Sequence, residues 1–492
     1  MITRRNALIA GGALAATVVT PRGSAAFEAP REVDDVHSQL NRTRVRSVIE
    51  PASLGDVQRA IAFARRHGRA VCIAGGRHAM GGQQFADGGL LLDMRRMRRV
   101  IALDAERGVV DVESGIEWPD LVAALARLQE GRDRPWSIVQ KQTGADRLTI
   151  GGALAANVHG RGLRYRPIVQ DVESFTLVDA GGDVLACDRQ RNAELFRLVI
   201  GGYGLFGVVT SVRLRLAPRR KLRRVVEVSA CERLPVAFAA RIADGFEYGD
   251  FQFSTDTASD DFLRTGVFSC YRPVPDATPI PPSQRELHAD DWGELLYLAH
   301  ADKRRAFECY RDHYLATNGQ IYWSDEHQLG VYLDDYHRAL DRRLGSSERA
   351  TEMITEIYVP RALLPDLLGE MREDFRRHDV DLIYGSVRLI ERDDETFLAW
   401  AREPWACVVL NLHVVHTTAG IERAAAAFRR LIDMAARRGG TYYLTYHRWA
   451  TRAQVEACHP RLPPCLARKR VYDPDERFQS EWYRHYRAMF AA

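Results

Sequence analysis

The chain has 492 residues, of which 46% are hydrophobic and 27% charged. This is the composition of a globular protein and excludes a disordered chain, a coiled coil and a collagen-like fibre. The 69 basic and 65 acidic side chains leave a formal net charge of +4 and form no basic stripe typical of nucleic-acid binding. Eight cysteines are too few for a disulfide scaffold, and no apolar run of about 18 residues predicts a transmembrane segment.

The first 26 residues have the pattern of an export signal. Arg4 and Arg5 precede a weakly apolar stretch at 7–19, and small residues offer cleavage positions at Ala25 or Ala26. A secretory leader with a twin-arginine signature has this layout. We therefore predict a signal peptide at 1–26 and a periplasmic or secreted protein. An amphipathic first helix and an uncleaved anchor are the alternatives.

We predict a first domain over residues 27–220, because short apolar runs alternate there with helical stretches. A helix is predicted at 57–66, because Val57, Ala60, Ile61 and Ala64 fall on one face. A second helix is predicted at 118–128, and strands are predicted at 70–74, 89–93, 109–112, 176–178 and 208–216. Glycine-rich loops follow several of these strands, which is an α+β pattern.

The pattern changes after residues 219–224, a basic run that is either a linker or a solvated strand edge. Strands at 353–359 and 407–415 and helices at 363–375 and 421–436 are predicted in a central domain over 221–435. We expect this domain to be an antiparallel sheet flanked by helices, with a proline-rich surface loop at 273–282. A C-terminal segment, 436–492, begins with an aromatic strand at 442–446 and continues as a polar, basic tail.

The cysteines divide into two kinds. Cys72 and Cys407 lie in apolar, strand-like runs typical of buried free thiols. Cys458 and Cys465 are close enough to pair, and export permits a disulfide. The sequence has no C-x-x-C pair and no zinc-type spacing, so no metal site is predicted.

Three glycine-rich segments carry most of the chemical signal, at residues 74–83, 149–160 and 200–210. Glycines let backbone N–H groups approach an anion closely, so three such loops together are able to wrap a pyrophosphate, whereas one alone is usually a tight turn. The third segment matches G-x-G-x-x-G at Gly202, Gly204 and Gly207. A strand rather than a helix follows it, with no acidic residue at the required distance, which excludes a nicotinamide Rossmann site.

The order and spacing of these pieces resemble the FAD-binding domain of the vanillyl-alcohol oxidase (PCMH-type) flavoprotein family. The resemblance runs over 46–218 and includes Pro51, Asp56 and the run 194–196. Residues 468–478 resemble the D-P-x-x-x-F ending of this family, which implies a tail that returns to the FAD domain. The resemblance therefore implies FAD as the cofactor.

The resemblance places cofactor-binding residues in all three loops and in the segment before the second. They are Ala74, Gly75, Gly76, Arg77, His78, Ala79, Gly82, Gln83, Gly144, Ala145, Thr149, Gly151, Gly152, Ala155, Asn157, Val158, His159, Gly160, Gly207 and Val209. His78 occupies the position at which many members attach FAD covalently. Arg77 stands where the family usually has glycine, so a histidine that only forms hydrogen bonds is the alternative. No cysteine in the second loop supports a second covalent bond.

The remaining motifs resemble several branches of the family. The second loop and the tail are similar to decaprenylphosphoryl-ribose oxidases and to alditol or aldonolactone oxidases, and the histidine loop is similar to cytokinin dehydrogenases. Residues 387–398 resemble the substrate strand of the lactone and alditol oxidases, with its arginine at Arg388. Three positions depart from these patterns: Tyr446 replaces a catalytic lysine, Ser386 a glutamate and Gly144 a catalytic aspartate. The exact substrate therefore does not transfer.

The chemistry of a flavin site defines the catalytic candidates. Flavin N5 accepts a hydride, so the protein must bind the donor, remove its proton and stabilise charge. The candidates are Arg388, Asn411, His413, Tyr446 and His447, for each of which a structural role is the alternative. We expect an oxidoreductase acting on a CH–OH group of a sugar, polyol, lactone or other small alcohol, with oxygen, a quinone or a cytochrome as acceptor. Oxidation of an amine or a C–C bond, and flavin binding without turnover, are the alternatives.

Overall fold

The computed structural model of the chain describes residues 30–330, 333 and 335–491. The export signal predicted at 1–26 lies outside this range. Among the described residues, none of the helices combines the length and the apolar character needed to cross a bilayer. Helices and sheets alternate along the chain, and the predicted α+β class is confirmed.

A small parallel sheet begins the first part of the chain. Its strands, in spatial order, are β3 (Ser47–Ile49), β5 (Leu90–Asp93) and β4 (Val71–Ala74). Helix α1 (Leu54–Arg66) packs on this sheet through Val57, Ala60, Ile61 and Ala64, which are at most 3% exposed. The predicted helix and its apolar face are therefore confirmed.

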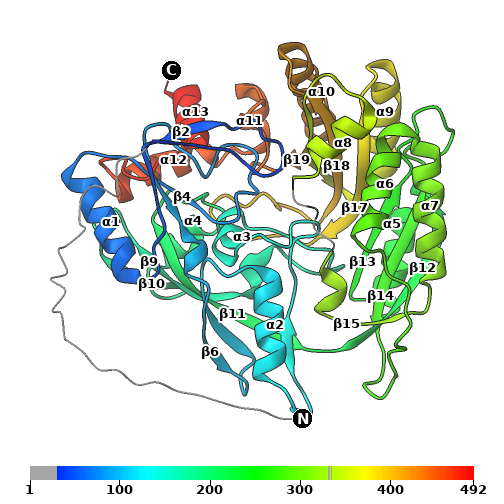
Figure 1. Cartoon of the computed structure of the whole chain (residues 1–492), viewed down its shortest axis with the longest axis horizontal. Helices are drawn as coiled ribbons and strands as arrows, with labels where there is room; N and C mark the ends of the chain where they lie inside the picture. Colours follow the sequence, from blue (N-terminus) through cyan, green and yellow to red (C-terminus); the bar gives the residue numbers. More distant parts are fainter. Residues whose placement is uncertain (1–29, 331–332, 334, 492) are drawn as a thin grey trace, which may run out of the picture.

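An antiparallel sheet completes the first part (Figure 1). Its strands run in the order β10 (Val184–Asp188), β9 (Val172–Val178), β11 (Val208–Pro218), β7 (Val109–Glu113) and β6 (Val100–Asp104), with β8 (Trp136–Ile138) beside the end of β11. The short pair β1 (Arg31–Val33) and β2 (Thr43–Val45) lies apart. The helices of this part are α2 (Trp118–Leu128), α3 (Ile150–Ala156) and α4 (Ala193–Val199). Every strand and helix predicted here is confirmed within a few residues.

A long antiparallel sheet, here called the second sheet, dominates the other half of the molecule (Figure 1). Its strands run in the order β15 (Ile321–Trp323), β12 (Lys221–Ala230), β14 (Thr265–Pro273), β13 (Tyr248–Phe253), β17 (Leu382–Ile390), β18 (Trp405–Val415), β16 (Ala350–Pro360) and β19 (Thr441–Tyr442). Side chains alternate between its two faces, so Met353, Ile357 and Val359 of β16 point away from Glu356.

Helices cover both faces of the second sheet. One face packs on α5 (Leu234–Ala243), α9 (Leu364–Arg377) and α10 (Thr418–Arg437), where Ile357 shares a core with Leu367 and Phe428. The other face meets the first part of the chain and, further out, α6 (Ala289–Ala301), α7 (Lys303–Ala316) and α8 (His337–Leu344). This second face carries the functional residues described below.

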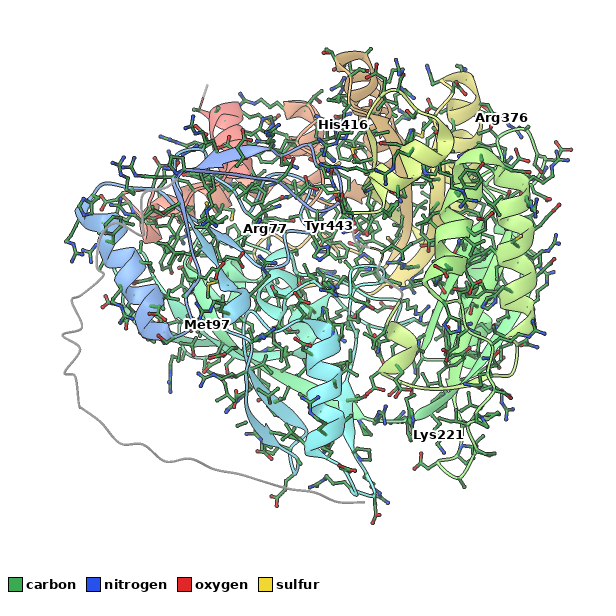
Figure 2. The ribbon with its side chains drawn as sticks, in the orientation of Figure 1. Arg77, Met97, Lys221, Arg376, His416 and Tyr443 are labelled. Atoms are coloured by element: carbon green, nitrogen blue, oxygen red, sulfur yellow. The ribbon has the colours of Figure 1, made fainter. Side chains whose placement is uncertain are left out.

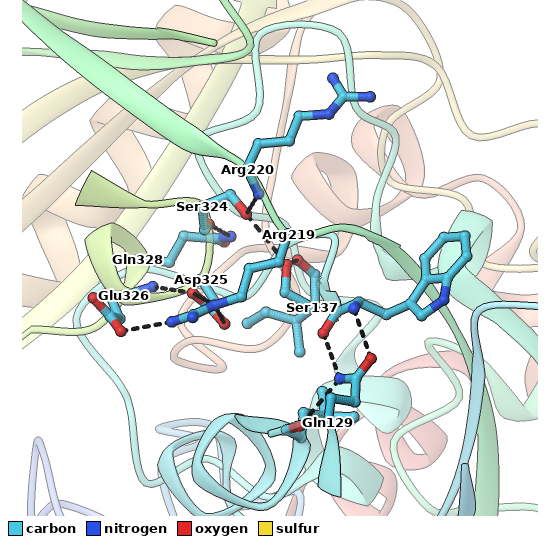
Figure 3. Close-up of polar contacts among 11 residues, drawn as sticks. Gln129, Ser137, Arg219, Arg220, Ser324, Asp325, Glu326 and Gln328 are labelled. Atoms are coloured by element: carbon cyan, nitrogen blue, oxygen red, sulfur yellow. Dashed lines mark hydrogen bonds and ion pairs between the residues drawn. The ribbon is translucent and has the colours of Figure 1, made fainter. Parts of the chain in front are cut away.

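The junction between the two halves is short and held by polar contacts (Figure 3). Strand β12 starts at Lys221, so Arg219 and Arg220 alone separate it from β11, and the strand-edge interpretation of the basic run is the better one. Arg219 Nε lies 2.9 Å from Asp325 Oδ2, and its Nη2 lies 2.6 Å from Glu326 Oε1. These ion pairs fix the direction in which the chain enters the second sheet.

The C-terminal segment is more ordered than a polar tail. Only Thr441–Tyr442 of the predicted aromatic strand is a strand, and three helices follow it: α11 (Arg452–Cys458), α12 (Leu462–Tyr472) and α13 (Glu481–Phe490). Phe478 lies beside Val71 of β4 and joins the core under α1, so the tail packs on the first part of the chain. Buried aromatic residues spaced three and four apart, such as Trp482 and Tyr486, stabilise α13.

The thiols of the described residues are all free. Cys72 and Cys407 are buried, as predicted. Cys458 and Cys465 are also buried and unpaired, so the disulfide that their spacing allows is not formed. Cys458 ends α11 and Cys465 lies in α12, and each side chain is taken up by the apolar core.

Candidate active site

A cavity lies between the first part of the chain and the second sheet. It has about 1410 Å³ of empty space, a volume that includes space open to solvent. Figure 2 labels one wall residue from each side, Arg77 from the histidine loop and Tyr443 from the segment after β19. The cavity therefore joins two regions far apart in the sequence.

Most of the predicted cofactor-binding residues line this cavity. They are Ala74, Gly75, Gly76, Arg77, His78, Ala79, Gln83, Gly144, Ala145, Thr149, Gly151, Gly152, Ala155, Val158, His159, Gly207 and Val209. Gly82, Asn157 and Gly160 lie behind the wall. Asn157 ends α3 with φ 50° and donates a hydrogen bond of 2.9 Å to Asp393 Oδ2, so it supports the loop from outside the cavity.

The glycines allow the loops to approach each other closely. A Cβ on Gly75 would lie 2.1 Å from Thr149 Oγ1, and a Cβ on Gly76 would lie 2.3 Å from the carbonyl oxygen of Arg147. No side chain larger than glycine fits at either position without moving the second loop. The first and second loops are therefore packed as one wall, which explains the need for glycine at these positions.

Polar atoms of the wall remain available for a ligand. Ser114 Oγ and Gln84 Oε1 are buried, border the cavity and have no hydrogen-bond partner among the described residues. A buried polar atom without a partner is costly, so such atoms commonly mark the place of a polar ligand. Together with the glycine loops, they fit a polar, elongated cofactor such as FAD.

His78 and Arg77 lie at the turn after β4. Arg77 has φ 60°, a conformation that glycine adopts most easily, and its Nη2 lies 3.0 Å from Asp93 Oδ2. This ion pair offsets the strain at a position where the resembling family has glycine. His78 Nδ1 lies 2.9 Å from His37 Nε2, and burial holds the pKa of His78 well below its usual value. His78 is therefore a neutral imidazole at the cavity wall.

A buried carboxylate that the sequence analysis missed, Glu356 of β16, lies at the centre of the opposite wall. Its Oε1 accepts a hydrogen bond of 2.8 Å from the Tyr446 hydroxyl, and its Oε2 accepts one of 2.7 Å from His159 Nε2 and another from Tyr358. Burial alone raises the pKa of Glu356, but the charge and hydrogen bond of His159 and the charge of Arg388 outweigh it and lower the pKa to about 2. Glu356 is therefore ionised.

Arg388 lies near this carboxylate on β17. Its side chain is buried and borders the cavity, yet it forms no hydrogen bond or ion pair with any residue that the structure describes. Buried charges are normally paired. An unpaired guanidinium at a cavity wall is therefore suited to an anionic or strongly polar ligand atom.

Of the other four catalytic candidates, one borders the cavity and three do not. Tyr446 borders the cavity, whereas Asn411, His413 and His447 are outside its described wall. Asn411 and His413 share the face of Glu356, but β18 rises about 3.4 Å per residue and carries them away from Cys407, which faces Arg388. His447 stacks on Trp449 with ring centroids 4.2 Å apart, and burial lowers its pKa to about 3.

The sequence contained a signal for Glu356. Residues 350–360 form a largely buried strand in which Glu352 and Glu356 recur on one face, and both are buried. Buried carboxylates in such a strand are rare unless paired. Other wall residues outside the prediction include Ser114, Gln142, Ile354, Tyr443 and Thr445, which show no motif. Tyr203 also borders the cavity and lies within the third glycine-rich segment.

Comparisons with known proteins agree with this geometry. Residues 45–188 match the FAD binding domain family. The chain is similar to L-gulonolactone oxidase of Mus musculus, with 29% identity over 35% of this chain and 37% of that protein. It is also similar to cytokinin dehydrogenase 2 of Arabidopsis thaliana, with 32% identity over 35% and 34% of the two chains.

One relative matches nearly the whole chain. L-Gulono-1,4-lactone dehydrogenase of Mycobacterium tuberculosis is 26% identical over 89% of this chain and 95% of that protein. The matches of higher identity span little more than a third of the curated relatives, 37% of the first two. The family match covers the region that supplies the first two glycine-rich segments. Residues 45–188 form an FAD-binding domain, and FAD is the cofactor of this chain.

Proposed function

We propose that the chain is an FAD-dependent oxidoreductase that removes a hydride from a CH–OH group of a small sugar, polyol or lactone. The observation that carries this proposal is the single cavity lined both by the FAD-binding loops and by Glu356, Arg388 and Tyr446. Bound FAD supplies the hydride-accepting chemistry. The similarity to a lactone dehydrogenase extends over the second sheet and supports a lactone or related alcohol as the donor.

The second sheet is the substrate domain in this proposal, and Glu356 orients the donor. Its ionised carboxylate is suited to accept a hydrogen bond from a substrate hydroxyl and would take up the hydroxyl proton as the hydride is removed from the carbon. Burial and the charge of Glu356 hold the pKa of Tyr446 well above its usual value, so Tyr446 keeps its proton and acts as a donor. Tyr446 and His159 therefore position Glu356 rather than act as bases.

Arg388 has a separate role, the stabilisation of the negative charge that would develop on the flavin as it accepts the hydride. Its guanidinium has no competing partner among the described side chains and lies in a buried wall. Preorganised positive charge in a water-poor site is an effective way to stabilise a transition state. This role fits the resemblance of residues 387–398 to a substrate strand.

His78 is proposed to carry FAD covalently. It borders the cavity at the end of the first glycine loop and is neutral, which is the nucleophilic form of imidazole. Its hydrogen bonds to His37 and to the backbone of Arg147 support the alternative of a purely positioning histidine. Acid precipitation distinguishes the two, as described in the Discussion.

The function is tested by the visible spectrum of the purified protein. We expect flavin absorbance near 450 nm and bleaching under anaerobic conditions with at least one member of a panel of aldonolactones, polyols and sugars. Absence of flavin would contradict cofactor binding. Bleaching by amines alone would contradict the CH–OH assignment, and no bleaching by any donor would indicate a flavin protein without turnover.

Export is proposed from residues 1–26 alone. A twin-arginine signal suits a protein that binds its cofactor before it crosses the membrane. Replacement of Arg4 and Arg5 by lysine should retain the protein in the cytoplasmic fraction of the host, while wild type appears in the periplasm or medium. If wild type and the variant were found in the same fractions in equal proportions, the proposal would be contradicted.

A further inference from the structure

A second cluster of polar side chains lies on the same face of the second sheet, outside the cavity wall. It combines His300 of α6, His413 of β18 and Asp381, which directly precedes β17. One possible ligand atom from each of the three lies within 4.8 Å of the other two. Three such atoms at this spacing surround a point that a metal ion is able to occupy after small side-chain adjustments.

His300 is oriented by a carboxylate. Its Nε2 lies 2.9 Å from Glu352 Oε1, and both side chains are only 4% exposed. The hydroxyl of Tyr336 also donates to Glu352, and His337 Nδ1 lies 3.6 Å away. A histidine that ligates a metal commonly donates its other N–H to a carboxylate in this way. The contact leaves Nδ1 of His300 for a ligand.

His413 has no such partner. Its ring forms no hydrogen bond with any described residue, and its Nδ1 is fully enclosed. The ring stands edge-on to that of His300, with centroids 4.8 Å apart. An enclosed, unpaired imidazole nitrogen beside a second imidazole indicates a missing ligand.

Asp381 contributes a carboxylate and a route to solvent. Lys303 Nζ lies 2.7 Å from its Oδ1, which leaves Oδ2 for another cation. The side chain is 43% exposed, which gives an ion access to the cluster.

We propose that His300, His413 and Asp381 bind a divalent first-row metal ion such as Zn²⁺, with water as the fourth ligand. Two imidazoles and a carboxylate suit Zn²⁺ in tetrahedral geometry. The ion joins α6 to β18 and to the start of β17, so it clamps the helical cover onto the second sheet. The three ligands are far apart in the sequence, which explains why spacing rules predicted no metal site.

The other group with metal-binding residues, His159, Glu356 and Cys407, does not compete with this proposal. The carboxylate oxygens of Glu356 already accept hydrogen bonds from Tyr446, Tyr358 and His159 itself. That group belongs to the cavity wall. The His300 cluster differs because it has an unpaired imidazole and a free carboxylate oxygen.

The test uses the full chain with FAD bound, after removal of metals with a chelator. Titration with Co²⁺ should give one bound ion per chain with the intense visible bands of a tetrahedral N/O site, and Zn²⁺ should displace it and raise the melting temperature. Binding weaker than millimolar, or with no defined stoichiometry, would overturn the proposal.

Variants assign the ligands. His413→Ala and Asp381→Asn should each weaken Zn²⁺ binding at least about tenfold, and Glu352→Gln, which acts through His300, should weaken it about 10–100-fold. His378→Ala is the matched control, because His378 is exposed and faces Asp374 at 3.6 Å without a third described ligand. Unchanged Zn²⁺ affinity in both ligand variants would overturn the assignment. Flavin absorbance and circular dichroism verify that each variant is folded, and Asp381→Asn keeps the shape of the site.

Discussion

The two walls of the cavity are built in different ways. The FAD-binding wall is made of loops whose glycines pack against each other, as Gly76 does against the Arg147 carbonyl. The wall of the second sheet is made of side chains at alternate strand positions, such as Glu356 and Arg388. Backbone recognition leaves contiguous glycine motifs in the sequence, whereas side-chain chemistry leaves single residues separated by apolar ones. The first wall is therefore predicted from sequence more completely than the second.

The largest expected effect concerns the loop wall. Gly76→Ala should abolish FAD loading, because its Cβ would lie 2.3 Å from the Arg147 carbonyl oxygen and force the two loops apart. The ratio of absorbance at 450 nm to that at 280 nm measures the loading. Gly369→Ala in α9 is the control, since the added methyl group would meet nothing beyond its own helix backbone within 4 Å and loading should not change. Full loading of Gly76→Ala would show that close packing of the loops is not required.

His78→Ala tests covalent attachment at the same wall. Wild-type protein should keep its yellow colour after acid precipitation, and the variant should release all flavin into the supernatant. His67→Ala, in the turn after α1, is the control and should behave as wild type. Wild-type protein that loses its flavin on precipitation would restrict His78 to positioning the cofactor.

A pH-dependent effect is expected at the side-chain wall. The pKa of Glu356 is lowered to about 2, so its ion pair stabilises the folded state above pH 4.5 and this contribution is lost as the pH falls through 2. The difference of about 2.5 pKa units corresponds to on the order of 3 kcal/mol. Urea unfolding should show Glu356→Gln to be less stable at pH 6, by an amount that shrinks toward pH 3.

The control for this measurement is Glu373→Gln, which changes an exposed residue of α9 and should alter stability little at any pH. A difference in the free energy of unfolding between wild type and Glu356→Gln that stays constant between pH 6 and pH 3 would contradict the account. It would show that Glu356 is not an ionised carboxylate stabilised by hydrogen bonds from His159 and Tyr446.

The smallest effect concerns the thiols. All eight cysteines are free, and Cys309 is the exposed one among them. A thiol reagent should therefore modify one group in the native protein and eight in denaturant, and a reductant should leave the melting temperature unchanged. Six reactive thiols in denaturant would indicate a disulfide, with Cys458 and Cys465 as the first pair to examine. Cys309→Ser should remove the native reaction.

The two walls also differ in how far the sequence predicts their residues. Helix α1 was predictable because four small apolar residues repeat with helical period, and 17 of the 20 predicted cofactor residues border the cavity because their motifs are local. Asn157 was included because it lies within such a motif, although its side chain turns outward to Asp393. Local sequence thus predicts a loop better than the direction of each side chain in it.

The side-chain wall depends on strand register, which a single sequence does not specify. Arg388 was found through a resemblance, whereas Glu356 comes beside it only because β16 and β17 both pair with β18. His413 was chosen as a polar residue on the right strand, but it lies six residues along β18 from Cys407. The helices of the tail were missed because α11 and α12 bury few apolar residues, and because Arg484 and His485 separate the buried aromatic residues of α13.

The central claim is that the loops hold the cofactor while the second sheet supplies the chemistry, and Arg388→Ala tests it most directly. Stopped-flow measurement of anaerobic flavin reduction, with the donor found by bleaching, should show an unchanged flavin content. The rate should fall roughly a hundredfold, equivalent to about 3 kcal/mol of transition-state stabilisation. Arg388→Lys should recover part of the lost reduction rate, because lysine keeps the charge but lacks the planar guanidinium with its paired N–H donors. Arg377→Ala, at an exposed position of α9, should reduce as wild type does. Reduction of Arg388→Ala at the wild-type rate would contradict the account.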